Sequence, residues 1–145
     1  MSVIARAGKG CMMTLFDAQD AYKQLLVRIQ DLHQQVFMAD GQYFIDFCAS
    51  FGSLYGNDAY SCFAYVHCAL LALAAKCPLL FYYVDNYFNV TPFAGVQTLS
   101  NALAQAARLR QEAINSGILF HQFEGPTDNF IGWLIDTEAM TVCIS

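Results

Sequence analysis

The sequence has little charge. Only 13% of its 145 residues are Asp, Glu, Lys or Arg, which is about half the share usual in soluble domains. Lys and Arg number seven and form no run, and the net charge is −5. Because capture of nucleic acid relies on clustered cations, this composition argues against nucleic-acid binding by charge alone. With 57% apolar residues, the chain is expected to cover apolar surface with a protein partner or to aggregate when isolated.

Paired cysteines, a secretion signal and a membrane span are also lacking. No two of the six cysteines form a CxxC pair, and the N-terminus lacks the basic-then-apolar order of a signal peptide. We therefore expect reduced thiols and an intracellular location, cytoplasmic or nuclear. His67, Lys76 and Pro78 interrupt the most hydrophobic stretch, residues 62–84, which favours a buried helix and strand over a membrane span. No linker or repeat divides the chain, so one domain over residues 1–145 is expected.

Strand and helix patterns alternate along the chain. Apolar runs predict strands over residues 11–16, 36–38, 43–47, 79–84, 87–90, 118–121, 130–135 and 141–144, with a hairpin turn at Asp40-Gly41. Helical spacing predicts a short helix or helical turn within residues 17–26 and longer helices over about 57–75 and about 93–116. The second is apolar nearly all round and is therefore expected to be buried, with Asn57-Asp58 as its cap. The order predicts an α+β fold, an antiparallel central sheet with helices packed on one face.

Two aspartates lie at the ends of apolar strands, where burying a carboxylate is unfavourable in free energy unless another group pairs with it. Asp17 ends an apolar strand, and Asp85 lies in the turn of the only strongly apolar hairpin. On neighbouring strand ends, the two carboxylates could hold Mg²⁺ through oxygen ligands, as two-metal phosphoryl transfer requires. Aspartate also favours turns and strand ends. From the residues alone, Asp17 and Asp85 could therefore equally be solvated turn residues that bind no metal.

Five motifs carry a resemblance to a known family. Phe16-Asp17-Ala18-Gln19-Asp20-Ala21-Tyr22 resembles the first catalytic block of reverse transcriptases, in which an apolar residue and Asp are followed by two variable residues, Asp-Ala and an aromatic. Tyr83-Val84-Asp85-Asn86 resembles their Tyr-x-Asp-Asp turn. The other motifs, which resemble the Phe-Gly block, the Leu-Gly-Ile…Glu-Gly-Pro stretch and the primer-grip hairpin, are Phe51-Gly52, residues 116–126 and residues 130–137. Together they cover nearly the whole chain and resemble the retrotransposon type.

The resemblance implies a polymerase palm that performs two-metal nucleotidyl transfer on a nucleic-acid primer-template with deoxynucleoside triphosphates (dNTP). Asp17 and Asp85 would be its catalytic residues and, with Asn86, its Mg²⁺ ligands. Tyr22 would be the steric gate beneath the incoming sugar, and Ala18 would lie near the triphosphate. Phe51 and Gly52 would complete the nucleotide-binding site.

The sequence departs from the family at several positions. Asn86 replaces the second Asp of the turn, and its neutral oxygen weakens metal binding. Ser50 stands where the family has proline, and the lysine expected near residues 121–123 is absent. Few residues precede Cys11 and none follow Ser145, so most of the fingers and all of the thumb are expected to be missing. We expect little or no polymerase activity from this chain alone, with weak binding of primer-template and dNTP.

Two alternatives stay open. The chain could be a non-catalytic retroelement remnant that acts as a scaffold or binding module. It could also be an unrelated α+β domain in which Asp17 and Asp85 are ordinary turn residues. The polymerase interpretation requires the turn at 85–86 to lie beside the strand that ends at Asp17, and the unrelated domain does not.

Overall fold

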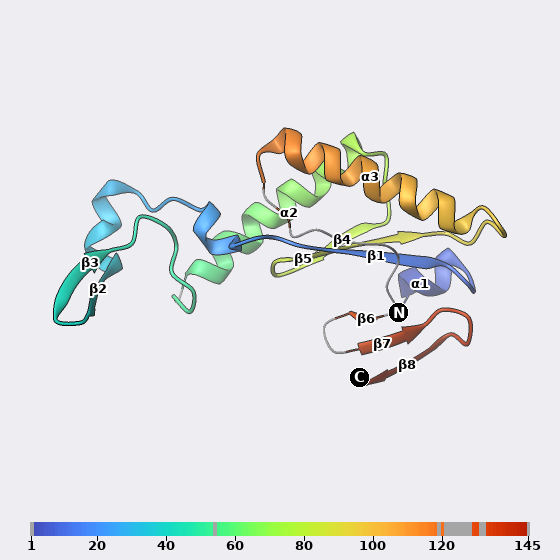
Figure 1. The fold of residues 1–145 in the computed structure, drawn as a ribbon, viewed down its shortest axis with the longest axis horizontal. Helices are drawn as coiled ribbons and strands as arrows, with labels where there is room; N and C mark the ends of the chain where they lie inside the picture. The colour runs from blue at the N-terminus through green and yellow to red at the C-terminus, as the bar shows by residue number, and fades with distance from the viewer. Residues whose placement is uncertain (1, 54, 119, 121–128, 131–132, 145) are drawn as a thin grey trace.

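A three-stranded antiparallel sheet lies at the centre of the protein (Figure 1). The structure is a computed structural model that describes residues 2–53, 55–118, 120, 129–130 and 133–144. Strand β1 (Met12–Asp17) pairs with β5 (Asn86–Thr91), and β5 pairs with β4 (Leu80–Tyr83). The order β1-β5-β4 therefore places the β4–β5 hairpin directly beside the strand that ends at Asp17.

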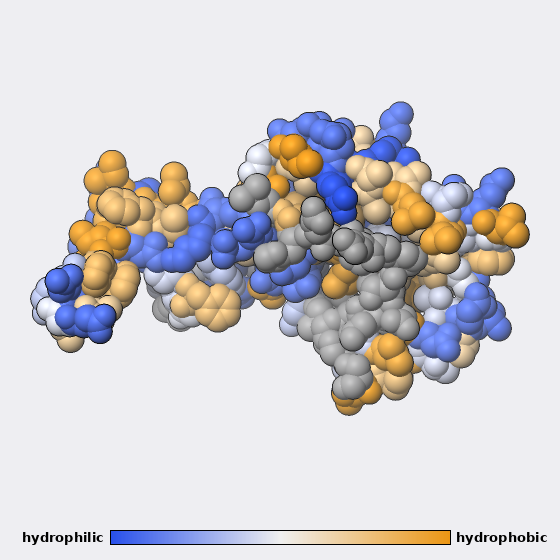
Figure 2. Space-filling model, in the orientation of Figure 1, coloured by the Kyte–Doolittle hydropathy of each residue, from blue (hydrophilic) through white to orange (hydrophobic). Residues whose placement is uncertain are grey.

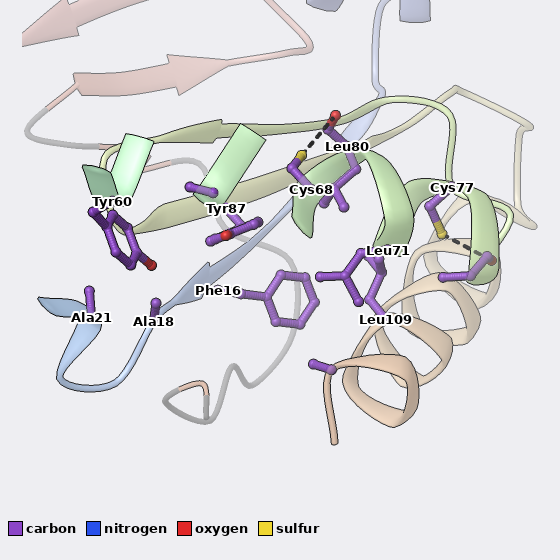
Figure 3. Packing of buried hydrophobic residues seen from close by; sticks show 13 residues of the cluster. Phe16, Ala18, Ala21, Tyr60, Cys68, Leu71, Cys77, Leu80, Tyr87 and Leu109 are labelled. Atoms are coloured by element: carbon purple, nitrogen blue, oxygen red, sulfur yellow. Dashed lines mark hydrogen bonds between the residues drawn. The ribbon is translucent and has the colours of Figure 1, made fainter. Parts of the chain in front are cut away.

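Two long helices cover one face of this sheet. They are α2 (Gly56–Ala74) and α3 (Thr98–Ser116), which lie on the same side of the sheet in Figure 1. Side chains of β1 and β5 alternate between the two faces, and Phe16 and its cross-strand partner Tyr87 point into the core beneath the helices. Figure 3 shows this core, which also contains Tyr60, Leu71 and Leu109. The antiparallel sheet with helices packed against it confirms the predicted fold class.

Shorter elements cover the opposite face. Helix α1 (Ser2–Ala7) lies there with a second three-stranded sheet of β6 (Asn129–Phe130), β7 (Trp133–Asp136) and β8 (Thr141–Ile144). Met13 and Val90, which are cross-strand partners, pack there against Ile4 and Ile135 in a separate apolar cluster. The central sheet is thus covered on both faces, as an apolar sheet requires.

A two-stranded sheet lies apart from the central sheet (Figure 1). Two short 3₁₀ helices, η1 (Ala21–Gln24) and η2 (Ile29–Gln35), lead into a hairpin of β2 (Val36–Ala39) and β3 (Gln42–Ile45). Its two turn residues, Asp40 and Gly41, have φ angles of 50° and 73°, and positive φ at both positions is what a type I′ hairpin turn requires. The Asp-Gly prediction of this hairpin is therefore confirmed.

Several sequence predictions differ from the structure. Of the two alternatives expected within residues 17–26, the structure has the helical turn, the four-residue η1, and α3 begins at Thr98 rather than near residue 93. Helix α2 is not buried all round, because Tyr65, Val66, Leu70 and Leu73 are exposed. Its N-cap is Tyr55, without a side-chain hydrogen bond, so Asn57 and Asp58 do not cap it. In the described part of the chain the strands form three sheets, and α1 was not predicted.

Part of the C-terminal prediction lies outside the described residues. The expected strand over residues 118–121 is represented by Phe120, which forms a bridge with Ala18, and the Gly125-Pro126 turn lies in the range that is not described. Among the described residues, no helix is long and apolar enough to cross a membrane.

A buried histidine connects α2, β5 and α3. The Ser116 hydroxyl donates to the carbonyl of Ala113 at 2.8 Å, so its oxygen accepts the Nε2–H of His67 at 3.0 Å. The remaining ring nitrogen, Nδ1, is then the acceptor for the Tyr87 hydroxyl at 3.2 Å. Burial lowers the pKa of His67, because a charged imidazolium loses its hydration in the core. The folded state therefore favours the neutral form of the His67 ring.

This burial predicts a loss of stability in mild acid. Below pH about 6.5, His67 takes up a proton in the unfolded chain but not in the folded one, so the free energy of unfolding falls by up to about 1.4 kcal/mol per pH unit. Urea denaturation at pH values from 8 to 5, about the range in which histidine titrates, measures this slope. The variant His67→Gln lacks the titrating group, and equal slopes for both proteins would contradict the prediction.

Candidate functional site

The two candidate carboxylates come from adjacent strand ends. Asp17, the last residue of β1, lies opposite Asn86, the first residue of β5. Asp85 immediately precedes Asn86 in the β4–β5 turn, and its carbonyl oxygen accepts the backbone N–H of Ala18 at 2.8 Å. Since cross-strand partners have Cα atoms about 4.5–5.5 Å apart, Asp17 and Asp85 lie at the same end of one sheet.

Asn86 holds the side chain of Asp85. Its Nδ2 donates a hydrogen bond to Asp85 Oδ1 at 3.0 Å, so the amide nitrogen is used within the turn and the amide oxygen is left as a neutral acceptor. An aspartate at position 86 could not donate this bond and would add a second negative charge beside the first. Asn86 therefore orients Asp85 and relieves charge repulsion, while it offers less to a cation than a carboxylate does.

The turn that carries Asp85 is strained. Val84 has a φ of 54°, a left-handed conformation that is unfavourable for a β-branched residue. Such strain persists where the surroundings fix the backbone, and it is common at functional sites. Here the strands on both sides fix it, because Tyr83 pairs with Asn86 and Asn86 pairs with Asp17.

Aromatic residues gather beside the carboxylates. Tyr22, on η1, contacts Phe51 edge to face, with ring centroids 5.3 Å apart, and Tyr60 of α2, with centroids 5.4 Å apart. The Tyr22 hydroxyl donates to Asn57 Oδ1 at 3.1 Å. Phe51 is 85% exposed, and Gly52 follows it with a φ of 83° that favours glycine. Two predicted site segments far apart in sequence are thus brought into contact.

Tyr60 is the residue that sequence reasoning missed. It has no exposed surface, and Figure 3 shows it beside Ala18 and Ala21. Burial, with the negative charges of Asp85 and Asp17 adding to the effect, raises the pKa of Tyr60 to about 12. Both carboxylates therefore act on one hydroxyl group. In the sequence Tyr60 is one more aromatic in an apolar helix, and no local pattern marks it out.

The oxygen atoms at these strand ends are of the kind that binds a hard cation such as Mg²⁺, but they are few. Among the described residues, no group of three or more His, Cys, Asp and Glu side chains lies close enough to hold a metal ion. What the strand ends offer is two carboxylates and the amide oxygen of Asn86. Mg²⁺ is commonly held by one or two carboxylates together with substrate phosphates and water, so these residues fit Mg²⁺ as a weak site.

Comparison with known proteins gives the fold. No family model and no curated protein matches this sequence. Among solved structures, the crystal structure of prototype foamy virus protease-reverse transcriptase matches 92% of the chain with a TM-score of 0.64, at 14% sequence identity. The foamy viral protease-reverse transcriptase in complex with an RNA/DNA hybrid matches 94% with a TM-score of 0.63, at 12% identity.

The matched region is a small part of those viral proteins. The chain covers 17% of the first and 18% of the second, so it spans less than a fifth of their length. At these identities the likeness concerns the fold. The chain therefore has a reverse-transcriptase-like fold, and this agrees in part with the resemblance seen in its motifs.

Proposed function

We propose that this chain is a palm unit of the reverse-transcriptase type, built for two-metal nucleotidyl transfer on a nucleic-acid primer-template. The observation that carries the proposal is the pairing of Asp17 with Asn86, which puts Asp17 and Asp85 at one end of a single sheet. The reverse-transcriptase-like fold over more than nine-tenths of the chain supports it.

Each site residue has a role in this proposal. Asp17 and Asp85 would hold Mg²⁺, with Asn86 orienting Asp85 through its amide. When bound, Mg²⁺ supplies charge neutralisation at the transferring phosphoryl group. Backbone groups from Ala18 to Ala21 would lie along the triphosphate. Tyr22 would pack beneath the sugar and exclude a 2′-hydroxyl, because Phe51 and Tyr60 hold its ring from two sides.

Activity from this chain alone would be weak. Phosphoryl transfer depends on cations that hold the triphosphate, and the two cations that lie between Tyr22 and Phe51 in the sequence are already paired. Lys23 pairs with Asp46, and Arg28 pairs with Asp31 at 2.7 Å. Together with the neutral Asn86, this favours a second candidate function, a remnant that keeps the palm fold as a scaffold without catalysis.

Binding of divalent ions separates the two candidates. We expect the chain to bind Mn²⁺ or Mg²⁺ weakly, and we expect Asp17→Asn and Asp85→Asn each to weaken binding by about tenfold or more, because each removes one of two anionic ligands. Calorimetric titration with Mg²⁺ and paramagnetic titration with Mn²⁺ measure this. Asp58→Asn, on the exposed first turn of α2, is the matched control and should bind as the unmodified chain does. Equal binding by all four proteins would refute the palm proposal.

A further inference from the structure

An Asp-Gly pair forms the exposed tip of the β2–β3 hairpin. Asp40 and Gly41 connect Ala39 to its cross-strand partner Gln42, and both turn residues are exposed. Figure 2 shows hydrophilic residues among the hydrophobic ones at this projecting end of the molecule. No other aspartate in the sequence is followed by glycine, so Asp40 has a neighbour that the other aspartates lack.

The two groups that could react with each other at this tip are not engaged elsewhere. Within the described part of the chain, the Asp40 carboxylate forms no hydrogen bond or ion pair, and the N–H of Gly41 forms no hydrogen bond. Even a Cβ atom added to Gly41 would meet no other group within 4 Å. The Asp40 side chain can therefore turn back toward the nitrogen of Gly41.

The chemistry open to this pair needs only water. The Gly41 nitrogen attacks the side-chain carboxyl carbon of Asp40, a C–N bond forms, and the C–O bond breaks as water leaves with the amide proton. Glycine favours this step because it has no Cβ to crowd the nitrogen, and both groups are already held close together. Water then opens the resulting cyclic imide. Addition at the side-chain carbonyl restores aspartate, and addition at the main-chain carbonyl leaves isoaspartate, in which the chain runs through the side chain.

The hairpin opens easily enough to allow the rotation that ring closure requires. Asp40 has a φ of 50°, and its Cα–C bond must turn to bring the Gly41 nitrogen to the side chain. Only four residue pairs join β2 to β3, and the large apolar side chains of both strands are 43% to 78% exposed. A two-stranded hairpin is marginally stable in water, so its tip opens locally while the protein stays folded.

We propose that Asp40 is a self-modification site, at which isoaspartate forms and opens the β2–β3 hairpin. A type I′ turn connects its strands through two residues with positive φ, and Asp40 and Gly41 have this conformation. Isoaspartate adds a methylene group to the backbone between them, so the turn no longer fits the pairing of Ala39 with Gln42. The short strands then lose the connection that sets their register.

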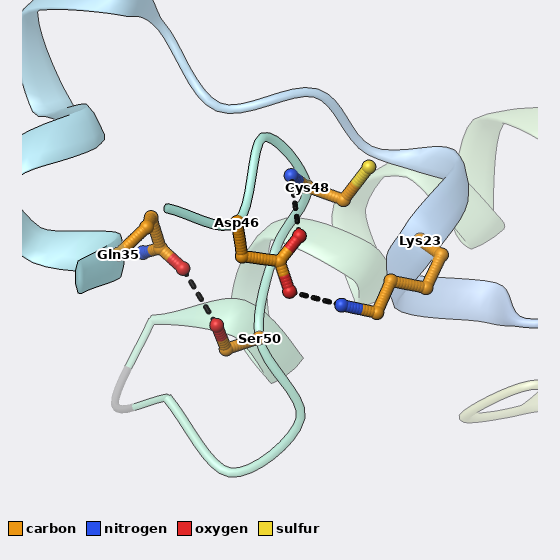
Figure 4. A network of polar contacts seen from close by, with 5 residues as sticks. All are labelled: Lys23, Gln35, Asp46, Cys48 and Ser50. Atoms are coloured by element: carbon orange, nitrogen blue, oxygen red, sulfur yellow. Dashed lines mark hydrogen bonds and ion pairs between the residues drawn. The ribbon is translucent and has the colours of Figure 1, made fainter. Parts of the chain in front are cut away.

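The base of the hairpin confines this change to the tip and the two strands. Figure 4 shows the base, where Lys23 pairs with Asp46 and the Ser50 hydroxyl donates to Gln35 Oε1 at 2.6 Å. These contacts do not involve the turn, so they persist when it changes. Isoaspartate at Asp40 therefore acts as a local switch that opens the hairpin and leaves the central sheet in place.

Prolonged incubation of the folded chain at body temperature, followed by peptide mapping with electron-transfer fragmentation, tests the first step. We expect isoaspartate at Asp40 to form at least about tenfold faster than at Asp58, which is also exposed but precedes alanine. Gly41→Asn keeps a residue that tolerates positive φ and should slow the reaction at least about tenfold, because its Cβ crowds the nitrogen. Asp40→Asn keeps the turn and should react faster, because a neutral amide accepts the attack more readily than a carboxylate. Circular dichroism shows whether each variant folds.

Hydrogen exchange of the purified isoaspartate form tests the second step. We expect the amides of β2 and β3 to exchange at least about tenfold faster than in the unmodified chain, with those of β1 and β5 unchanged. Isoaspartate that is no more abundant at Asp40 than at Asp58 overturns the proposal, and so does Gly41→Asn that reacts as fast as the unmodified chain. Unchanged exchange in β2 and β3 overturns the switch. None of these results depends on whether Asp17 and Asp85 bind a metal.

Discussion

Replacing Tyr60 with alanine is expected to remove about 3–5 kcal/mol of unfolding free energy, the range for truncating a large buried aromatic side chain. Tyr60 has no exposed surface and contacts the rings of Tyr22 and Phe63. A small domain is stable by only about 5–15 kcal/mol, so this substitution consumes a large part of the total. Urea denaturation followed by circular dichroism measures the loss.

The hydroxyl of Tyr60 is expected to matter much less than its ring. Within the described part of the chain it forms no hydrogen bond of normal geometry, and its interaction with the Tyr87 hydroxyl, which lowers the pKa of Tyr60 against the effect of burial, is therefore a weak one. Tyr60→Phe keeps the ring and removes the hydroxyl, so its free energy of unfolding should lie within about 1 kcal/mol of that of the unmodified chain. A large loss in Tyr60→Phe would show that the hydroxyl, and not the ring, stabilises this core.

Tyr60 also explains why part of the site could not be predicted from sequence. Its neighbours Tyr22 and Phe63 are 38 and 3 positions away, and only the packing of α2 against η1 brings Tyr22 to it. The positions of the two aspartates could be predicted from the sequence, because each comes at the end of an apolar strand. A strand pattern fixes where its last side chain lies relative to the sheet edge. Their roles as metal ligands stay a prediction.

The elements that sequence reasoning missed depend on tertiary contacts. A helix was possible from Asp17, but Ala18 donates its N–H to Asp85 and bridges Phe120 instead. The chain therefore stays extended through Ala18, turns at Gln19 and Asp20, and forms only the short 3₁₀ helix Ala21–Gln24. The start of α3 is set in part by Thr98, whose hydroxyl accepts the N–H of Ala94 at 2.8 Å and donates to the carbonyl of Gly95 at the same distance. The hairpins were predictable because a two-residue turn is specified locally.

Restoring a carboxylate with Asn86→Asp is expected to strengthen divalent-ion binding by about tenfold. At a protein surface, two unit charges 4 Å apart interact by at most about 4 kcal/mol, and solvent screening reduces this to about 1–2 kcal/mol for a partly exposed site. The same change should weaken the metal-free fold, because it replaces the Asn86 donor to Asp85 with a like charge. Calorimetric titration and thermal denaturation, with and without Mg²⁺, measure both effects.

The opposite signs of these two effects make the experiment specific to the site. Asn101→Asp is the matched control, because Asn101 is exposed on α3 and the substitution adds the same charge away from the carboxylates. It should leave metal affinity unchanged and should not lower metal-free stability, because a carboxylate near the N-terminus of a helix is favourable. If Asn86→Asp lowered stability without any gain in affinity, Asp17 and Asp85 would be neighbouring turn residues whose mutual repulsion Asn86 relieves. A gain in affinity that also recovers the lost stability would instead mean that the strand ends form a metal site one carboxylate short.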